Sequence, residues 1–195
     1  MAKRIFIWVG HPGKTSLNSG LADRYAAAAA AEGSEVRRMD LHDMQFGESN
    51  FGGYDGNRQT LEPDLLQWQE NMKWADHVLV VYPYWWGGMP GRMKSVLDRA
   101  LLPGFGFKYK GNGLAWDKLL TGKTGDVIIT SDTPPLLDRL LYNKPGRRVI
   151  RNQVLSFVGI KPRNVVQFGS VKVAKPAKIA GWLDRAAEMG QRAAA

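Results

Sequence analysis

The segment WVGHPGKTS, residues 8–16, contains residue types that hold phosphate groups: glycines, a lysine and two hydroxyl side chains. A triphosphate-binding loop needs the pattern Gly-x-x-x-x-Gly-Lys-[Ser/Thr], because a wide loop of backbone N–H groups must surround the phosphates. Counting back from Gly13 places Trp8 at the position of the first glycine, inside an apolar run. The spacing therefore argues against a kinase or triphosphatase loop.

The same segment favours a single phosphate, because a short loop that opens a helix presents unpaired N–H groups at the positive end of the helix dipole. The side chains of His11, Thr15, Ser16 and Asn18 can add hydrogen-bond donors. The alternative is that Ser16 and Asn18 are ordinary helix caps and that His11 is a loop histidine.

A second informative stretch is VVYPYWWGGMPGRMKSVLDRALL, residues 80–102, in which an aromatic, glycine-rich loop joins a predicted strand to a predicted helix. Trp85 and Trp86 can flank a flat ring, and glycines allow a ligand to approach the backbone closely. The alternative is that the two tryptophans pack in the core or in an interface. A phosphate cradle after the first strand and an aromatic platform after the third would be neighbours, and together they suit a flavin nucleotide.

Five runs rich in β-branched and aromatic residues predict the strands, with helical patterns between them. They cover residues 4–10, 34–41, 76–83, 125–130 and 164–171. Nearly continuous apolar runs such as VLVVY are typical of a parallel sheet covered on both faces. Ligands of such sheets bind at the carboxyl ends of the strands, so functional residues are expected just after Val9, Tyr82 and Ile129.

The helices that follow these strands carry their own start and stop signals. Ser16 is a predicted cap for a helix that runs through the alanines of 26–31 and stops near Gly33. Pro90 suits the first turn of another helix. Its apolar stripe consists of Met93, Val96, Leu97, Ala100 and Leu101. Further helices are predicted within 135–158 and over about 177–192, whereas 43–63 and 102–117 are predicted as irregular stretches.

Composition limits the classes of protein. A chain of 195 residues with 44% hydrophobic residues can fill one core, so residues 1–195 are expected to form a single domain. The net charge of +9 favours anionic partners such as nucleotides, nucleic acid or acidic lipid. Only charge favours nucleic acid, and without a motif for it we expect no nucleic-acid partner.

The absence of cysteine excludes disulfides, thiol catalysis and cysteine-ligated metal. His11, His42 and His77 have no chelating spacing, so no metal site is expected. No apolar run reaches the roughly 18 residues of a membrane-spanning helix, and we expect a cytoplasmic protein without membrane insertion.

The segments GHPGKTSLNSGLA (10–22) and YPYWWGGMPGRMKSVLDRALLPGFGFKY (82–109) resemble the NAD(P)H:quinone reductases and related NAD(P)H-dependent flavin oxidoreductases of the flavodoxin-like superfamily. The resemblance continues more weakly through GKTGDVIITSDTPP to the carboxyl terminus. It implies a three-layer α/β sandwich whose five-stranded parallel sheet has the order 2-1-3-4-5, with helices on both faces. It also implies a homodimer with one flavin at the carboxyl edge of each sheet. We expect FMN, with FAD as the alternative.

The resemblance assigns the site residues by motif matching. The flavin phosphate and ribityl region would be held by His11, Thr15, Ser16, Leu17 and Asn18, and the isoalloxazine would be lined by Pro83, Tyr84, Trp85, Trp86 and Gly87. A third loop, which begins with Thr130 and Ser131, matches a segment that contacts the pyrimidine edge of the ring. Here the chain reads TSDTPP where many relatives have Thr-Gly-Gly. Asp132 therefore either turns outward or changes how the ring sits.

The implied reaction passes hydride from NADH or NADPH through the flavin to a quinone or similar small acceptor in the same pocket. Trp86 would form part of the aromatic wall, and Tyr109 would line the acceptor site across the dimer. The alternative for Tyr109 is an ordinary surface or interface residue, and Tyr142 is a further candidate proton donor. Basic residues after position 139 can steer a dinucleotide or simply form a solvated face.

A second class of function stays open from the sequence. Proteins with this architecture include ancillary or regulatory subunits and electron carriers, which act through a protein partner. A carrier of that kind would reduce small quinones poorly.

Overall fold

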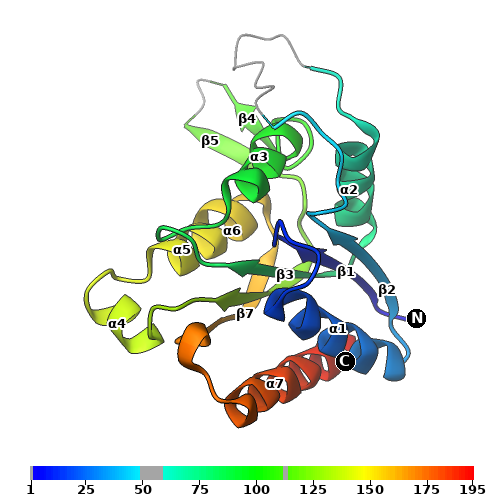
Figure 1. The fold of residues 1–195 in the computed structure, drawn as a ribbon. Coiled ribbons are helices and arrows are strands. Elements are labelled where there is room, and N and C mark those ends of the chain that lie inside the picture. The colour runs from blue at the N-terminus through cyan, green and yellow to red at the C-terminus, as the bar shows by residue number, and fades with distance from the viewer. Residues whose placement is uncertain (1, 49–58, 112–113) are drawn as a thin grey trace.

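The computed structural model describes residues 2–48, 59–111 and 114–195. A five-stranded parallel sheet forms the middle layer, with helices on both faces (Figure 1). Its strands are β1 (Arg4–Val9), β2 (Glu35–Asp40), β3 (His77–Pro83), β6 (Thr124–Thr130) and β7 (Lys161–Phe168). The strand order is β2-β1-β3-β6-β7, which confirms the predicted order when these five strands are counted along the chain.

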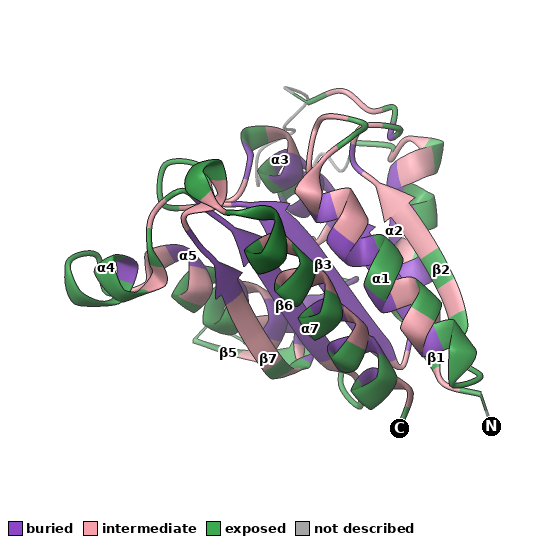
Figure 2. Ribbon diagram, turned by 60° about the horizontal axis from the view of Figure 1, so that its bottom comes forward, coloured by how far each residue is buried: buried purple, intermediate pink, exposed green. Residues whose placement is uncertain are grey.

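Two helices cover one face of the sheet and the remaining helices lie mainly against the other. The elements are α1 (Leu17–Ala31), α2 (Pro63–Trp74), α3 (Gly91–Ala100), α4 (Pro135–Leu140), α5 (Pro145–Arg148), the π-helical η1 (Val149–Leu155), α6 (Ser156–Val158), the 3₁₀ turn η2 (Val171–Val173) and α7 (Pro176–Ala194). Helices α1 and α7 lie across one face (Figure 2), whereas α2, α3 and the η1–α6 segment pack on the opposite face.

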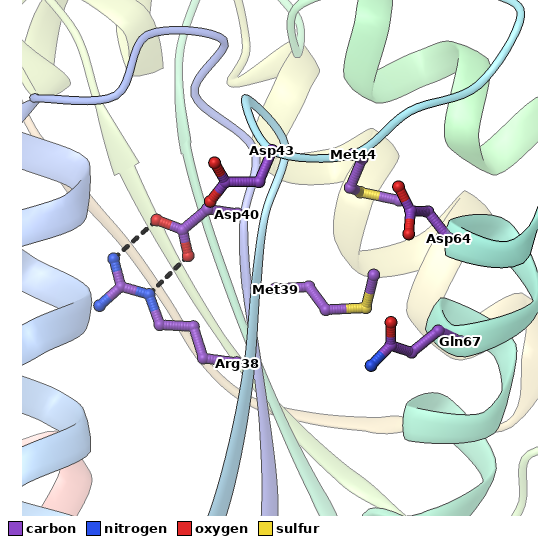
Figure 3. A pocket seen from close by; sticks show the side chains of 7 residues that line it. All are labelled: Arg38, Met39, Asp40, Asp43, Met44, Asp64 and Gln67. Atoms are coloured by element: carbon purple, nitrogen blue, oxygen red, sulfur yellow. Dashed lines mark hydrogen bonds and ion pairs between the residues drawn. The ribbon is translucent and has the colours of Figure 1, made fainter.

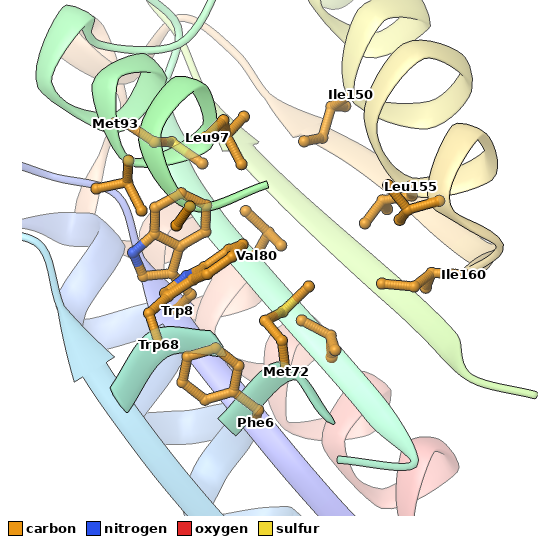
Figure 4. Packing of buried hydrophobic residues seen from close by; sticks show 14 of the residues in the cluster. Phe6, Trp8, Trp68, Met72, Val80, Met93, Leu97, Ile150, Leu155 and Ile160 are labelled. Atoms are coloured by element: carbon orange, nitrogen blue, oxygen red, sulfur yellow. The ribbon is translucent and has the colours of Figure 1, made fainter. Parts of the chain in front are cut away.

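Alternation along β1 divides the core into two layers, because successive side chains of a strand point to opposite faces. Phe6 and Trp8 join the cluster under α2 and α3 (Figure 4), while Ile5 and Ile7 join the cluster under α1 and α7. All four side chains are buried. The sheet therefore carries apolar residues on both faces, as the continuous apolar runs predict.

The first helix begins where its cap is predicted. Ser16 is the N-cap of α1, and its Oγ accepts a hydrogen bond from the N–H of Ser19 at 3.1 Å. Just after the helix, Gly33 has a φ of 84°, a conformation that glycine adopts without steric cost.

The stretch 102–117, which the sequence predicts to be irregular, contains most of an antiparallel hairpin formed by β4 (Phe107–Lys110) and β5 (Ala115–Lys118). The prediction is wrong here, because glycines interrupt the short strands and tertiary contacts anchor them. Trp116 stacks on Phe157 with ring centroids 4.6 Å apart, and its Nε1 donates to the carbonyl of Phe157 at 2.9 Å. The hairpin thus rests on α6.

The helix predicted within 135–158 is divided in two. Helix α4 ends at Leu140, and a second helical run begins at Pro145. Asn143 and Lys144 between them have φ values of 55° and 54°. The residue before a proline is disfavoured in the right-handed helical region, which explains a break at Lys144.

The described ends of the loop 43–63 are held by a carboxylate and a buried guanidinium, while residues 49–58 lie outside the described residues. The Nη1 atom of Arg99 donates to Glu62 Oε1 at 2.6 Å and to the carbonyl of Gly47 at 2.9 Å. The same carboxylate oxygen accepts the N–H of Gly47 at 2.9 Å. The hydrogen bond from Arg99 lowers the pKa of Glu62 to about 2.

We expect Glu62→Gln to lower the free energy of unfolding at pH 7 by about 2 kcal/mol, because Arg99 stays buried without its counter-charge. The folded-state pKa of Glu62 lies below its ordinary value of 4.5, so the carboxylate stabilises fully above that pH and progressively less as the pH falls towards 2. Urea unfolding of wild type and variant should therefore differ less at about pH 3 than at pH 7. An equal difference at both pH values would assign the effect to something other than the charge.

Candidate functional site

Three loops meet at the carboxyl edge of β1, β3 and β6, which lie side by side in the sheet (Figure 2). The first loop (10–16) follows β1, the second (84–90) follows β3 and the third (131–134) follows β6; together they form the three-loop site. The N–H of Gly10 donates to the carbonyl of Val81 at 2.7 Å, and the N–H of Tyr84 donates to the carbonyl of Thr130 at 2.7 Å. The side chains of Asn18 and Thr130 are hydrogen-bonded at 3.0 Å. The structure thus brings together the three segments that the sequence selects.

The first loop and the start of α1 present a group of free backbone donors. Within the described ranges, the N–H groups of Thr15, Ser16, Leu17 and Asn18 have no hydrogen-bond acceptor. The Thr15 residue is exposed. Free N–H groups at the positive end of a helix dipole form an arrangement that binds phosphate.

His11 and Asn18 are held by the protein itself. Nδ1 of His11 accepts the N–H of Gly13 at 2.9 Å, and its ring lies edge-on to that of Trp85, with centroids 6.0 Å apart. Asn18 is buried, and its amide bonds to the Thr130 hydroxyl. The two side chains therefore fix the first loop against the second and third loops.

The second loop contains a tight turn, Trp85–Gly88, in which two tryptophan side chains are exposed. The N–H of Trp85 donates to the carbonyl of Gly88 at 2.9 Å, and the reverse bond measures 3.0 Å. Between them, Trp86 and Gly87 have φ values of 50° and 77°, the pattern of a type I′ turn. This conformation is rare for a residue with a side chain and costs about 1 kcal/mol. The turn leaves the Trp86 ring fully exposed and that of Trp85 half exposed.

Tyr84 ties this second loop to the α4–α5 segment. Its hydroxyl donates to Asp138 Oδ1 at 3.2 Å and accepts the N–H of Gly146 at 3.0 Å. The buried Asp138 carboxylate also contacts Arg147, whose Nη2 lies 3.3 Å away. Burial raises the pKa of Tyr84, so its hydroxyl is protonated at neutral pH. The sequence alone does not identify Asp138 and Arg147 as partners of this loop, because nothing in their spacing links them to Tyr84.

We expect Tyr84→Phe to lower the free energy of unfolding by about 1–3 kcal/mol, since it leaves the Gly146 N–H and the Asp138 carboxylate without this partner. Chemical unfolding measures the loss, with the exposed Tyr142→Phe as the matched control. Unchanged stability would show that the hydroxyl does not fix the loop.

The third loop directs Asp132 away from the other two. Its Oδ1 accepts the N–H of Lys172 in η2 at 2.8 Å, so of the two alternatives for this residue the structure shows the outward one. Ser131 is buried; its Oγ donates to the carbonyl of Thr133 at 2.7 Å and accepts from Gln167 Nε2 at 2.9 Å.

The two candidate tyrosines lie apart from this edge. Tyr109 is half exposed in the β4–β5 hairpin, with its ring 5.1 Å from that of Phe107. Within the described ranges, Tyr109 makes no hydrogen bond and no ring contact with the three loops. Tyr142 is exposed just beyond α4.

A separate pocket of about 450 Å³ opens beside the carboxyl end of β2 (Figure 3). It is lined by Arg38, Met39, Asp40, Asp43, Met44, Asp64 and Gln67. The guanidinium of Arg38 is engaged by Asp40 and Asp23. The pocket contains three carboxylates, those of Asp40, Asp43 and Asp64, against the one guanidinium, so it opposes a phosphate, whereas the free N–H groups after β1 favour one.

The described residues contain no group of three histidine, cysteine, aspartate or glutamate side chains that could hold a metal ion. His77 is buried and its Nε2 lies 2.9 Å from the hydroxyl of Tyr25, while His42 pairs with Asp43 at 3.0 Å. None of the helices within the described ranges is long and apolar enough to cross a membrane.

The strand order and the three loops at the carboxyl edge define a flavodoxin-like α/β protein. The chain belongs to the family with a flavodoxin-like fold, which it matches over residues 3–191.

Its relatives include an uncharacterised NAD(P)H oxidoreductase of Haemophilus influenzae, 24% identical over 184 residues that cover 93% of this chain and 91% of that protein. An FMN-dependent NADH:quinone oxidoreductase of Ruegeria pomeroyi is 30% identical over 147 residues, covering 67% of this chain and 71% of the relative. The solved structure of an NAD(P)H:quinone oxidoreductase from Methanothermobacter marburgensis superposes with a TM-score of 0.81, at 19% identity and 98% coverage of both chains.

Proposed function

We propose that this chain is an NAD(P)H-dependent flavoprotein oxidoreductase that reduces a quinone or a similar small acceptor. The proposal rests on one observation. The loop that leads to the free N–H groups of residues 15–18 lies beside the loop with the exposed Trp85 and Trp86, because the rings of His11 and Trp85 are in contact. The two relatives named above as oxidoreductases support the same activity.

The residues fit FMN as the cofactor. The free N–H groups at the start of α1 would hold its single phosphate, and the turn at Trp85–Gly88 would lie beside the ring. When bound, the flavin supplies the redox chemistry that links NAD(P)H to the acceptor. The FMN-dependent relative supports FMN over FAD. The proposal includes both NADH and NADPH as hydride donors.

The protein's own contribution is positioning. Hydrogen bonds through Asn18, Thr130 and Tyr84 hold the three loops in one arrangement before a ligand arrives, which lowers the entropic cost of orienting two reactants. We further propose that the active form is a cytoplasmic homodimer of single-domain subunits, 1–195. Tyr109 of a second copy would then line the acceptor site, because in its own subunit it faces the hairpin.

Steady-state oxidation of NADH and NADPH by the purified, FMN-loaded protein tests the proposal. Rapid turnover with benzoquinone as the only acceptor supports an oxidoreductase. Slow turnover despite bound flavin would support an electron carrier or regulatory subunit that acts through a protein partner.

A further inference from the structure

Helix α4 projects from the body of the molecule (Figures 1 and 2), and apolar side chains in it and just after it are exposed. This surface, the α4 patch, consists of Leu136, Leu137, Leu140, Leu141 and Tyr142, which are 65%, 42%, 70%, 66% and 58% exposed. Single exposed leucines are ordinary in proteins, but five large apolar side chains within seven consecutive positions are not.

The helix is inverted relative to an ordinary surface helix, which buries its apolar face and exposes its polar one. The buried side chain of α4 is a carboxylate, Asp138, which bonds to Tyr84 and pairs with Arg147. The leucines of the patch are therefore not part of the hydrophobic core. The ion pair between Asp138 and Arg147 fixes the inner side of the helix, and the leucines lie on its outer side.

The segment that contains the patch is rich in cations. Asp138 is the only acidic residue between positions 134 and 160, a segment that also contains Arg139, Lys144, Arg147, Arg148 and Arg151. Arg147 is engaged by Asp138, and the other four cations have no ion pair within the described ranges. Exposed leucines bordered by unpaired cations match the pattern by which proteins bind the surface of an anionic bilayer. A second copy fits the patch poorly, because two such surfaces would oppose like charges.

We propose that the α4 patch docks the protein peripherally on an anionic lipid bilayer. The leucines enter the boundary between headgroups and acyl chains, Tyr142 lies at the headgroup level, and the cations contact anionic headgroups. This is surface binding by a short helix and requires no membrane-spanning segment.

The patch adjoins the three-loop site. Tyr84 bonds to Asp138 inside α4, and a Cβ added at Gly146 would lie 2.2 Å from Cε2 of Tyr84, so the second loop packs directly on the start of α5. Docking would therefore bring the loop with Trp85 close to the lipid. If the proposed function holds, this points to a lipid-dissolved quinone as the acceptor class; that extension rests on the proposed function, whereas the docking does not.

Cosedimentation of the full chain with vesicles tests the docking. We expect binding to phosphatidylcholine vesicles that contain about 30% phosphatidylglycerol, and weaker binding in high salt or to phosphatidylcholine alone. Leu140→Ser/Leu141→Ser and, separately, Arg148→Glu/Arg151→Glu should each lower the partition coefficient more than about tenfold. The matched controls are Leu66→Ser, an exposed leucine of α2, and Lys161→Glu/Lys175→Glu. Equal losses in the controls, or no binding by wild type, would overturn the proposal.

A site-specific probe keeps the test independent of folding defects. Because the chain has no cysteine, Leu140→Cys can be labelled uniquely with a polarity-sensitive fluorophore. Addition of anionic vesicles should shift its emission to the blue, whereas a label at Leu66→Cys should not respond. Vesicle binding without a response at position 140 would place the contact elsewhere and overturn the proposal.

Two measurements separate this proposal from its competitors. If Leu140→Ser/Leu141→Ser converts a dimer to a monomer in sedimentation velocity, the patch is a subunit interface and the docking proposal is wrong. Turnover with water-soluble benzoquinone tests the proposed function alone. Under both proposals the double variant keeps this turnover but loses turnover of a long-chain quinone held in anionic vesicles.

Discussion

The substitution Thr15→Glu should strongly weaken the binding of FMN while leaving the fold intact. Thr15 is exposed in the first loop, next to the free N–H groups that we assign to the phosphate. A carboxylate there would repel the phosphate, and like charges brought together cost several kcal/mol. We expect the Kd of FMN for Thr15→Glu to rise more than about a hundredfold, measured by quenching of flavin fluorescence.

The matched control is Thr60→Glu, which makes the same change of charge at an exposed threonine outside the three loops. The apo form of Thr15→Glu should unfold at or above the wild-type temperature, because a negative charge near the start of α1 favours the helix dipole. Wild-type affinity in Thr15→Glu would remove the first loop from the cofactor site.

We expect Trp68→Ala to lower the free energy of unfolding more than Glu62→Gln or Tyr84→Phe does. Trp68 is 1% exposed in α2, and its ring meets that of Trp8 edge-on at a centroid distance of 5.2 Å (Figure 4). Phe105 packs on it as well, at 6.3 Å. Removing a buried indole costs about 3–5 kcal/mol, which corresponds to about 10 °C in Tm for a chain of this size.

Two variants check that cavity formation is the cause. Trp68→Phe should lose clearly less than the alanine variant, because the Nε1 of Trp68 has no hydrogen-bond partner within the described ranges and the phenyl ring fills much of the space. Leu66→Ala, on the exposed side of the same helix, should change Tm little. A loss at Trp68→Phe as large as that at Trp68→Ala would contradict the packing argument.

The sequence could predict the sheet and the three loops because their signals are local. Continuous apolar runs mark the buried parallel strands, and Ser16 caps α1 where a hydroxyl before a helical pattern predicts it. The family resemblance implies the strand order. With that order, the strands that contain Val9, Tyr82 and Ile129 are neighbours, and their carboxyl ends lie at the same edge of the sheet.

What the sequence could not predict depends on contacts between distant positions. Tyr84 and Asp138 are 54 positions apart, and no pattern shows that a buried carboxylate holds the second loop. The same carboxylate is the buried side chain of α4. The leucines of this helix, which a helical pattern would place in the core, are therefore exposed. Asp132 likewise turns outward, because its carboxylate accepts a hydrogen bond from the backbone N–H of Lys172 in η2, which is 40 positions away in the sequence.

The visible absorption spectrum of the purified protein, taken anaerobically after addition of FMN, then NADPH, then benzoquinone, is the most direct test of the proposed flavin site. We expect a protein-bound flavin band at about 450 nm that bleaches with NADPH and recovers with the quinone. If no flavin binds, the assignment of residues 10–18 and 82–88 to a flavin site is contradicted, and a cofactor-free binding protein becomes the better description.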